Sequence, residues 1–429
     1  MPKPIICLSE QLNQYMESFR HCFSKRQWKY FVIVLLGLIE CEERKTLTGM
    51  LRVIGEQINI SGLSRFLNKY HWSTDEVSET WTNRFRQRMR PLVKAEHKRL
   101  RAEQVKGRGR PKATVVIGYM IFDDSVHKKP KGRKMEGLGK HYSHSEGKVV
   151  TGHSMFAGLY VLLGCQCPLK PRIYRSKNDC ELGGIPFLSK IDMAKKEIEN
   201  FHPIEGTHTH ILTDTWYLCK KLIKAAKKRG WDFTGGLKKN RIMRLIKADR
   251  SRELVTLSQY ATRLAPEDWQ VVNWPSQQGG HKCYAHIINT WIRKLGPTLL
   301  LVTCKDPYAS QKSFRFWGST VSDMDAQTFV DTLAIRWNIE TLFEYDKDLL
   351  GSDHYQLMSA EAILRFWTLI SCLLCFLDEQ RSFMKSPNLT YGEIRRIIQM
   401  DHMERFIHWI IDQFNSGISA EQLFLRLAL

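Results

Sequence analysis

The order of predicted strands and helices between residues 114 and 240 most limits what this chain can fold into. A β-branched and aromatic run, TVVIGYMIF at 114–122, predicts a buried strand. The spacing of apolar residues predicts four more strands and two helices after this run. The expected strands cover 147–152, 153–163, 210–213 and 232–237, and the expected helices cover 187–200 and 217–229. Strands and helices that alternate in this way are typical of an α/β domain.

The sequence on either side of this segment divides the rest of the chain. The N-terminal part is mostly helical. After residue 240, short extended runs between Pro, Gly and Ser turns indicate a β-rich insertion, and helical periodicity returns after 320. The predicted organisation is a helical region at 1–105, a basic linker at 106–113, the first part of the core at 114–240, the insertion at 241–320, the second part of the core at 321–380 and a helical region at 381–429.

The charge balance predicts a polyanionic partner. The 429 residues include 65 Lys and Arg against 44 Asp and Glu, and this net charge of +21 points first to nucleic acid and second to an acidic membrane surface. No apolar run reaches the roughly 20 residues of a membrane helix, and the N-terminus lacks a secretory pattern, so we expect no membrane partner. Eleven cysteines, an odd number scattered along a chain of this size, indicate reduced thiols in a cytoplasmic protein.

The positive charge is concentrated in three stretches. Residues 84–112 hold twelve Lys or Arg and two Glu, residues 220–250 hold twelve more, and a third cluster lies at 128–134. Any one of these clusters could be a solvated helix face, whereas three clusters around one segment favour a surface that binds DNA phosphates. The basic residues that we expect at that surface after the first and second acidic positions are Lys128, Lys129, Lys238, Lys239 and Arg241.

A possible DNA-reading element lies in the N-terminal region. The short amphipathic segments at 46–55 and 61–70 resemble a helix-turn-helix, in which Arg65, Asn68 and Lys69 of the second helix would face a DNA groove. Helical hairpins are common, so a plain packed hairpin remains the alternative.

The linker carries a second possible DNA-binding element. Its sequence KGRGRPK at 106–112 resembles an AT-hook, an extended peptide that would place Arg108 and Arg110 in a narrow minor groove. The alternative is a basic, Gly- and Pro-rich linker with no further role. In either case the segment marks a domain boundary.

Acidic residues lie where predicted strands end. Asp123 and Asp124 follow the strand at 114–122, and Asp214 follows the strand at 210–213. A strand end holds a side chain rigidly outside the sheet, which suits a catalytic or metal-binding carboxylate. A turn or a helix N-cap is the commoner role of any single aspartate at such a position, so only the combination of acids favours a functional site.

A third acid, Glu340, lies in the helix predicted over 334–350. Because a helix has 3.6 residues per turn, Arg336, Phe343 and Lys347 share one face with Glu340, and this face suits a charged ligand. Converging carboxylates repel each other unless cations lie between them, which predicts Mg²⁺ or Mn²⁺. Two such ions can clamp a scissile phosphate. The residues alone therefore indicate a metal-dependent phosphoryl-transfer enzyme that acts on nucleic acid.

The sequence RWNIETLFEYDKDLLGSDHYQLMSAEAILRF, at 336–366, is similar to the C-terminal catalytic block of bacterial insertion-sequence transposases of the DDE type. Those enzymes carry Tyr, Arg, Glu and Lys at fixed spacing. Here Arg336 precedes Glu340 by four residues and Lys347 follows it by seven, whereas Leu333 stands at the Tyr position. The blocks FDDS at 122–125 and LTDTWY at 212–217 resemble those around the other two acids of the family.

This resemblance implies a ribonuclease H-like, mixed-sheet α/β core interrupted by the β insertion, with a helical N-terminal DNA-binding region and a helical C-terminus. It implies Asp124 as the first catalytic acid, with Asp123 as the rival, and Asp214 and Glu340 as the second and third. All four acids are then candidate ligands of two Mg²⁺ ions, for which Mn²⁺ can substitute.

The resemblance also implies a function, namely cut-and-paste transposition at terminal inverted repeats. The DNA partners would be those repeats and the target DNA, held by Arg336 and Lys347 near the cleavage point. A homodimer would form in the synaptic complex, and the protein would be associated with the bacterial nucleoid in the cytoplasm. The alternatives are a domesticated transposase that acts as a DNA-binding regulator and a ribonuclease H-like DNA nuclease.

Overall fold

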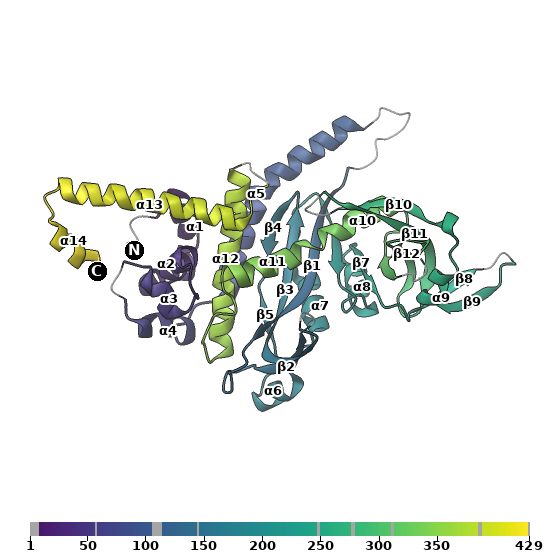
Figure 1. Cartoon of the computed structure of the whole chain (residues 1–429), viewed down its shortest axis with the longest axis horizontal. Coiled ribbons are helices and arrows are strands. Elements are labelled where there is room, and N and C mark those ends of the chain that lie inside the picture. The colour runs from purple at the N-terminus through teal and green to yellow at the C-terminus, as the bar shows by residue number, and fades with distance from the viewer. Residues whose placement is uncertain are drawn as a thin grey trace.

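The computed structural model places the two ends of the chain at one end of an elongated molecule (Figure 1). The first helices and the last two lie there, the sheet that begins with β1 lies in the middle, and strands β8 to β12 lie at the far end. The structure describes residues 8–55, 58–104, 114–143, 146–246, 249–275, 279–309, 313–384 and 388–427. The predicted linker and its Arg108 and Arg110 lie outside these residues.

The central part of the sheet is mixed, as the sequence predicts. Strand β1 (Val116–Lys128) pairs antiparallel with β3 (Lys148–Leu162) and parallel with β6 (Thr207–Thr213), which is itself parallel to β7 (Asp232–Leu237). The remaining strands of this part, which all pair with β3, are β2 (Gly139–Ser143), β4 (Cys165–Pro168) and β5 (Arg172–Tyr174). Such an α/β arrangement is consistent with the ribonuclease H-like core.

The β-rich segment continues the same sheet. Strand β13 pairs antiparallel with β7, and the strand order then runs β13-β12-β11-β8-β9, so the described residues form one sheet of 13 strands. This segment contains β8 (Ile242–Ile246), β9 (Arg252–Thr256), α9 (Leu257–Thr262), η3 (Pro266–Asp268), β10 (Gln270–Trp274), β11 (His281–Ile292), β12 (Gly296–Cys304) and β13 (Phe314–Ser319). Its apolar side packs under α10 (Ala326–Ile335) in a separate small core.

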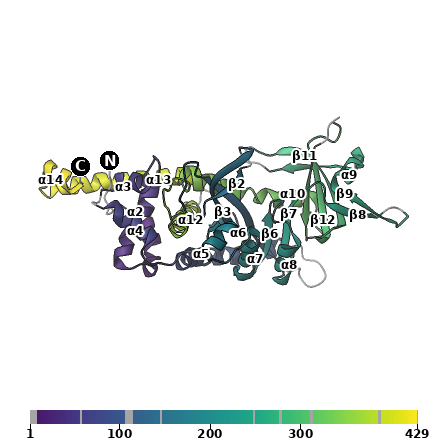
Figure 2. The ribbon, with the colours of Figure 1, turned by 90° about the horizontal axis from the view of Figure 1, so that it is seen from below.

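Helices cover both faces of the sheet (Figure 2). On one face lie α7 (Lys190–Asn200) and α8 (Lys220–Lys228), which pack on β3 and β7, and on the other lie α11 (Asn338–Glu344) and α12 (Ala360–Phe383), which contact β1 and β4. Because side chains alternate along a strand, neighbouring residues of β1 face different helices. A short helix, α6 (Lys177–Leu182), lies near the end of β2.

Helix α12 is the central helix of the molecule. It is the one helix of the described chain that is long and apolar enough to cross a membrane, but 89% of its most apolar window is buried inside the protein. The apolar run is therefore accounted for by contacts with α2, α4, α5, α13 and β4. Periodicity alone cannot separate a buried core helix from a spanning one of this length.

The N-terminal helices share one apolar core with the sheet domain. Arg365 of α12 donates hydrogen bonds to the carbonyls of Leu67 (2.9 Å) and Trp72 (3.2 Å), and it fixes the end of α4 against α12. The terminal elements are α1 (Glu10–Glu17), η2 (Arg20–Cys22), α2 (Lys25–Glu40), α3 (Leu47–Arg52), α4 (Ile60–Asn68), α5 (Thr74–Glu103), α13 (Tyr391–Asn415) and α14 (Ala420–Leu427).

The helix expected over 334–350 is broken in the structure. Helix α10 ends at Ile335, α11 begins at Asn338, and a π-helical turn, η4 (Tyr345–Leu349), follows directly. Gly351 ends the turn at a φ of +63°, a left-handed conformation that glycine adopts without strain. The apolar period continues through the break, and this explains why the sequence predicts one helix.

The substitution Gly351→Ala should destabilise the protein more than Gly147→Ala. Both glycines have a φ of +63°, so each substitution costs about 1–2 kcal/mol of backbone strain. A Cβ at Gly351 would also lie 2.3 Å from His354 Nδ1, whereas a Cβ at Gly147 would meet no atom within 4 Å. Thermal melting of the two variants beside wild type measures the difference, and equal melting temperatures would show that the turn relaxes freely.

Candidate active site

Two carboxylates from different elements meet one arginine beside the middle of β1. Asp123 Oδ2 lies 3.8 Å from Arg336 Nη1, and the same Nη1 donates a hydrogen bond of 3.1 Å to Glu340 Oε1. Arg336 occupies the break between α10 and α11, so its guanidinium reaches back over the first turn of α11. The break thus places a cation between an acid of the sheet and an acid of the helix.

A tight turn after β6 holds the third acid beside them. The expectation that Asp123 and Asp124 follow their strand is wrong, because β1 continues to Lys128 and both acids pair with β3 inside it. The parallel pairing of β1 with β6 ends at Phe122 and Thr213, so Asp123 and Asp214 are next to each other where that pairing stops. Asp214 Oδ1 accepts hydrogen bonds from the backbone N–H groups of Trp216 (2.9 Å) and Tyr217 (3.2 Å). Asp214 therefore organises its own turn and still keeps its second oxygen for another contact.

The carboxylates of the site are largely buried, and their negative charges repel one another. Burial first, and then the charge of Asp214, raise the pKa of Asp123 from 3.8 to about 8, and Asp124 and Glu340 act in the same direction. Burial also raises the pKa of Asp214, while its backbone hydrogen bonds and Arg336 oppose that rise. The chain's own cations leave the negative charge of this cluster incompletely balanced.

Asp124 points to different partners. Its carboxylate forms an ion pair with Lys190 of α7, accepts a hydrogen bond of 3.3 Å from Tyr217 Oη and lies 3.5 Å from Ser154 Oγ. Asp123, by contrast, faces Glu340 and Arg336. This alternation favours Asp123 over Asp124 as the acid that works with Glu340.

The donor set suits a hard divalent cation. Carboxylate oxygens are the ligands that Mg²⁺ and Mn²⁺ prefer, and Asp123, Asp214 and Glu340 supply them around an incompletely balanced negative charge. Within the described ranges, no three His, Cys, Asp or Glu side chains form a ready-made metal cluster. Arg336 holds Glu340 and lies near Asp123, so a metal ion would compete with its guanidinium for these oxygens.

Comparison with known proteins agrees with this geometry. A family model described as DDE superfamily endonuclease matches residues 18–279, and a second, described as transposase DDE domain, matches residues 188–376. The first covers more than half of the chain. The chain belongs to the DDE superfamily of endonucleases. Together the matches include Asp123, Asp214 and Glu340, and a search of curated proteins finds no match.

Predicted basic residues of this DDE endonuclease lie at the same edge as the acids. Lys238 and Lys239 are exposed directly after β7, whose end lies beside the end of β6 because the two strands are parallel. Arg241 is half-buried and donates a hydrogen bond of 3.3 Å to the carbonyl of Leu218 in the turn after Asp214. The first two lysines are thus placed to meet DNA at the site, whereas Arg241 supports the turn.

The two lysines at the end of β1 differ in their surroundings. Lys128 is partly exposed and pairs with Glu146. Lys129 is buried, and its ammonium donates hydrogen bonds to the carbonyls of Asp353 (2.5 Å) and Tyr355 (2.7 Å). Lys129 therefore fixes the loop after Gly351 and is not available for direct contact with DNA, although the sequence predicts such a contact.

The predicted helix-turn-helix residues also divide into two groups. Arg65 of α4 and Lys69, which directly follows α4, are exposed, as a DNA contact requires. Asn68 donates a hydrogen bond of 2.9 Å to the carbonyl of Ser64. It also accepts a hydrogen bond of 3.0 Å from the hydroxyl of Ser359, the N-cap residue of α12. Its amide therefore joins α4 to the sheet domain and is engaged within the protein.

Part of the basic stretch 84–112 is neutralised internally. Arg84 and Arg88 of α5 each form an ion pair of 2.5 Å with an acidic residue of α12. These pairs fasten the first half of α5 to the core. The charge that remains free for DNA along α5 is therefore smaller than the count of basic residues suggests.

The predicted stripe around Glu340 is split by the π-helical turn. Lys347 lies in that turn, where burial lowers its pKa and Asp346 is its neighbour. Phe343 is buried in the core and does not face a ligand, and Leu333, at the family's Tyr position, is buried under the insertion. Only Arg336 and Glu340 are in direct contact.

Sequence reasoning missed a buried polar cluster behind the site. His127 of β1 lies 3.6 Å from Asp346 Oδ2 and 3.5 Å from Ser352 Oγ, and Ser352 also donates a hydrogen bond to Asp346. His127 lies on the same face of β1 as Asp123, four residues away. The alternation of side chains along a strand could have placed His127 on the face of Asp123. The contact of His127 with Asp346 could not be predicted, because it depends on the π-helical turn η4.

The substitution Asp346→Asn should remove part of the pH dependence of stability. Burial raises the pKa of Asp346 from 3.8 to about 7, so folding favours its protonated form, and wild-type stability falls as pH rises from about 4 through 7. Lys347, His127 and Asp353 are the charged or titratable neighbours. We expect the melting temperature of the variant to rise relative to that of wild type between about pH 4 and 7. A constant difference across that range would contradict the assignment.

Proposed function

We propose that this DDE endonuclease is a transposase that cuts DNA at the terminal inverted repeats of an insertion sequence and joins the freed ends to a target. The observation that carries the proposal is the meeting of Asp123, Asp214 and Glu340 around Arg336, at an edge that also bears exposed lysines. Carboxylates for a metal beside cations for phosphates are what phosphoryl transfer on DNA requires.

The three acids have a common task in this proposal. Asp123, Asp214 and Glu340 would hold Mg²⁺, with Mn²⁺ as a substitute, and the bound metal would activate the attacking oxygen and stabilise the leaving one. Asp124, held by Lys190 and Tyr217, would keep the middle of β1 and the turn after β6 in register. In this proposal Asp124 supports the site, and Asp123 is the first catalytic acid.

Cations and tryptophans at the rim would hold the DNA. Arg336 and Lys347 would bind the phosphates next to the cleavage point, and Lys238 and Lys239 those further along. Among the twelve tryptophans of the chain, only Trp216 and Trp337 are largely exposed, at 63% and 56%, and each is within three residues of Asp214 or Glu340. Exposed rings beside a cleavage site suit stacking on unpaired bases.

Asparagine and glutamine substitutions test which acids are catalytic. Asp123→Asn, Asp214→Asn and Glu340→Gln should each reduce Mg²⁺-dependent cleavage of element-end DNA by at least about a thousandfold, because each removes a metal ligand. Binding of the same DNA should remain measurable. Asp124→Asn is the matched control, and it should retain far more cleavage than Asp123→Asn.

A reversed order, with Asp124→Asn inactive and Asp123→Asn active, would restore Asp124 as the first acid. Full cleavage by Asp214→Asn or Glu340→Gln would overturn the assignment of the site. A wild-type protein that binds the ends but never cuts them would favour the role of a DNA-binding regulator.

Strand transfer separates a transposase from a nuclease. Wild-type protein incubated with Mg²⁺, end DNA and a supercoiled target should yield products in which the 3′ ends are joined to the target. The ends would be paired by two copies of the chain, one on each. Cleavage without any joined product would favour the ribonuclease H-like nuclease.

A further inference from the structure

A groove with a volume of about 570 Å³ lies between the N-terminal helices and the loop that follows η4. Helices α3 and α4 form one wall, and residues 355–357 with α12 form the other. The groove contains three cations and several hydroxyl groups, which include those of Ser61 and Ser64 at the first turn of α4. Its cations are Lys45, Arg65 and Lys69.

We propose that this groove binds the sugar–phosphate backbone of the DNA, and that Arg44 and Lys128 extend it as a basic track toward the acids. The proposal rests on the proposed function, since it names where the DNA that is cut would lie. It assigns Arg44 and Lys45, which no sequence motif selects, as phosphate-binding residues.

Lys45 is the decisive residue of the groove. It lines the groove but is only 3% exposed. In the part of the chain that the structure describes, no carboxylate pairs with its ammonium, and burial lowers its pKa. A buried cation without a partner is costly for a folded protein, and an anion brought by a ligand would compensate it.

A series of contacts connects the groove to the acid-bearing strand. The backbone N–H of Lys45 donates a hydrogen bond of 3.1 Å to His354 Nδ1, and Lys129, which directly follows β1, donates hydrogen bonds to the carbonyls on either side of His354. The loop is thus fixed between α3 and β1. The groove is therefore joined through this loop to the strand that carries Asp123.

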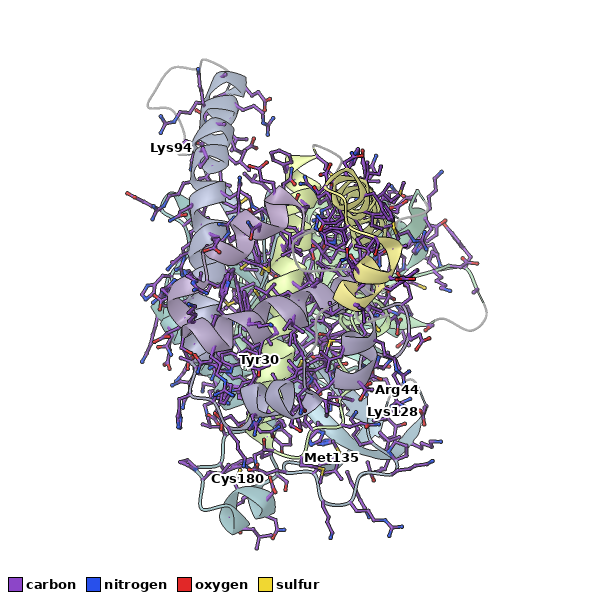
Figure 3. All side chains as sticks on the ribbon, turned by 90° about the vertical axis from the view of Figure 1, so that its left-hand side faces the viewer. Tyr30, Arg44, Lys94, Lys128, Met135 and Cys180 are labelled. Atoms are coloured by element: carbon purple, nitrogen blue, oxygen red, sulfur yellow. The ribbon has the colours of Figure 1, made fainter. Side chains whose placement is uncertain are left out.

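Positive charge continues along this connection. Arg44 is exposed next to Lys45, and Figure 3 shows its side chain on the same side of the molecule as Lys128. Arg44 is close enough to Lys129 for its charge to help burial lower the pKa of that lysine, and Lys128 acts in the same way on Lys347. The cations therefore form a series from the groove to η4.

The chemistry of the groove favours a phosphodiester backbone over a base edge. Its polar groups are cations and hydroxyls, which bind phosphate oxygens without regard to sequence. The alignment of several cations outside the groove suits an extended polyanion. A single inorganic phosphate could bind in the groove but would not reach the cations of the basic track.

Binding of a duplex of about 30 base pairs, measured by fluorescence anisotropy over a salt series, tests the proposal in the full-length protein. Lys45→Met, which keeps the buried stem, and Arg44→Ala should each weaken binding about three- to tenfold at moderate salt, and each should reduce the salt slope by about 0.9. Lys45→Arg should retain binding. Lys195→Ala is the control, since Lys195 is a partly exposed lysine of α7 that pairs with Glu199 at 2.8 Å.

The outcomes are distinct. Lys45→Met should melt at the wild-type temperature or above while it binds DNA more weakly, which separates lost binding from misfolding. Unchanged affinity and slope in Lys45→Met and Arg44→Ala would overturn the proposal, as would displacement of the duplex by inorganic phosphate beyond the effect of equal ionic strength. Because the readout is binding, a protein that binds here but never joins DNA would refute the proposed function and leave this inference intact.

Discussion

The parallel pairing of β1 with β6 is the constraint on which the site depends. Its register sets Phe122 opposite Thr213, so that Asp123 and Asp214 follow as neighbours at one edge. Two carboxylates placed by backbone hydrogen bonds cannot move apart to relieve their repulsion. The raised pKa of Asp123 is the consequence, and Arg336 at the break before α11 is the chain's own partial compensation.

The break between α10 and α11 does not separate Arg336 from Glu340. Arg336 and Trp337 keep right-handed helical dihedral angles, so Arg336 stays one turn before Glu340 and in contact with it while it also approaches Asp123. The π-helical turn η4 then shifts the phase and buries Asp346 against His127 and Ser352. A polar cluster behind the acids thus holds the helix that carries Glu340 against the strand that carries Asp123.

Much of the fold followed from the sequence, because burial imposes a period of two on strands and near four on helices. The mixed α/β sheet and most of its elements were predicted, although one long strand, β3, replaces two expected ones. The choice between Asp123 and Asp124 could not follow, because their side chains point to opposite faces and only tertiary packing decides which face α11 covers. The internal hydrogen bonds of Lys129 and Asn68 could not be predicted for the same reason. The sequence does not show whether a basic or amide side chain will bind DNA or a carbonyl of the protein itself.

The N-terminal helices pack directly on α12, and this packing would connect the proposed recognition of DNA to its cleavage. Arg365 holds α4, Arg84 and Arg88 hold α5, and Lys129 holds the loop that reaches α3. A DNA-binding module on a flexible tether would allow the bound DNA many positions relative to the acids. Here the same side chains that join the modules also hold α4 relative to β1, so DNA that binds the N-terminal helices as we propose would meet the carboxylates in one geometry. Holding two reacting groups in one orientation saves translational and rotational entropy, and this saving would be a large part of the catalytic effect in the proposed reaction.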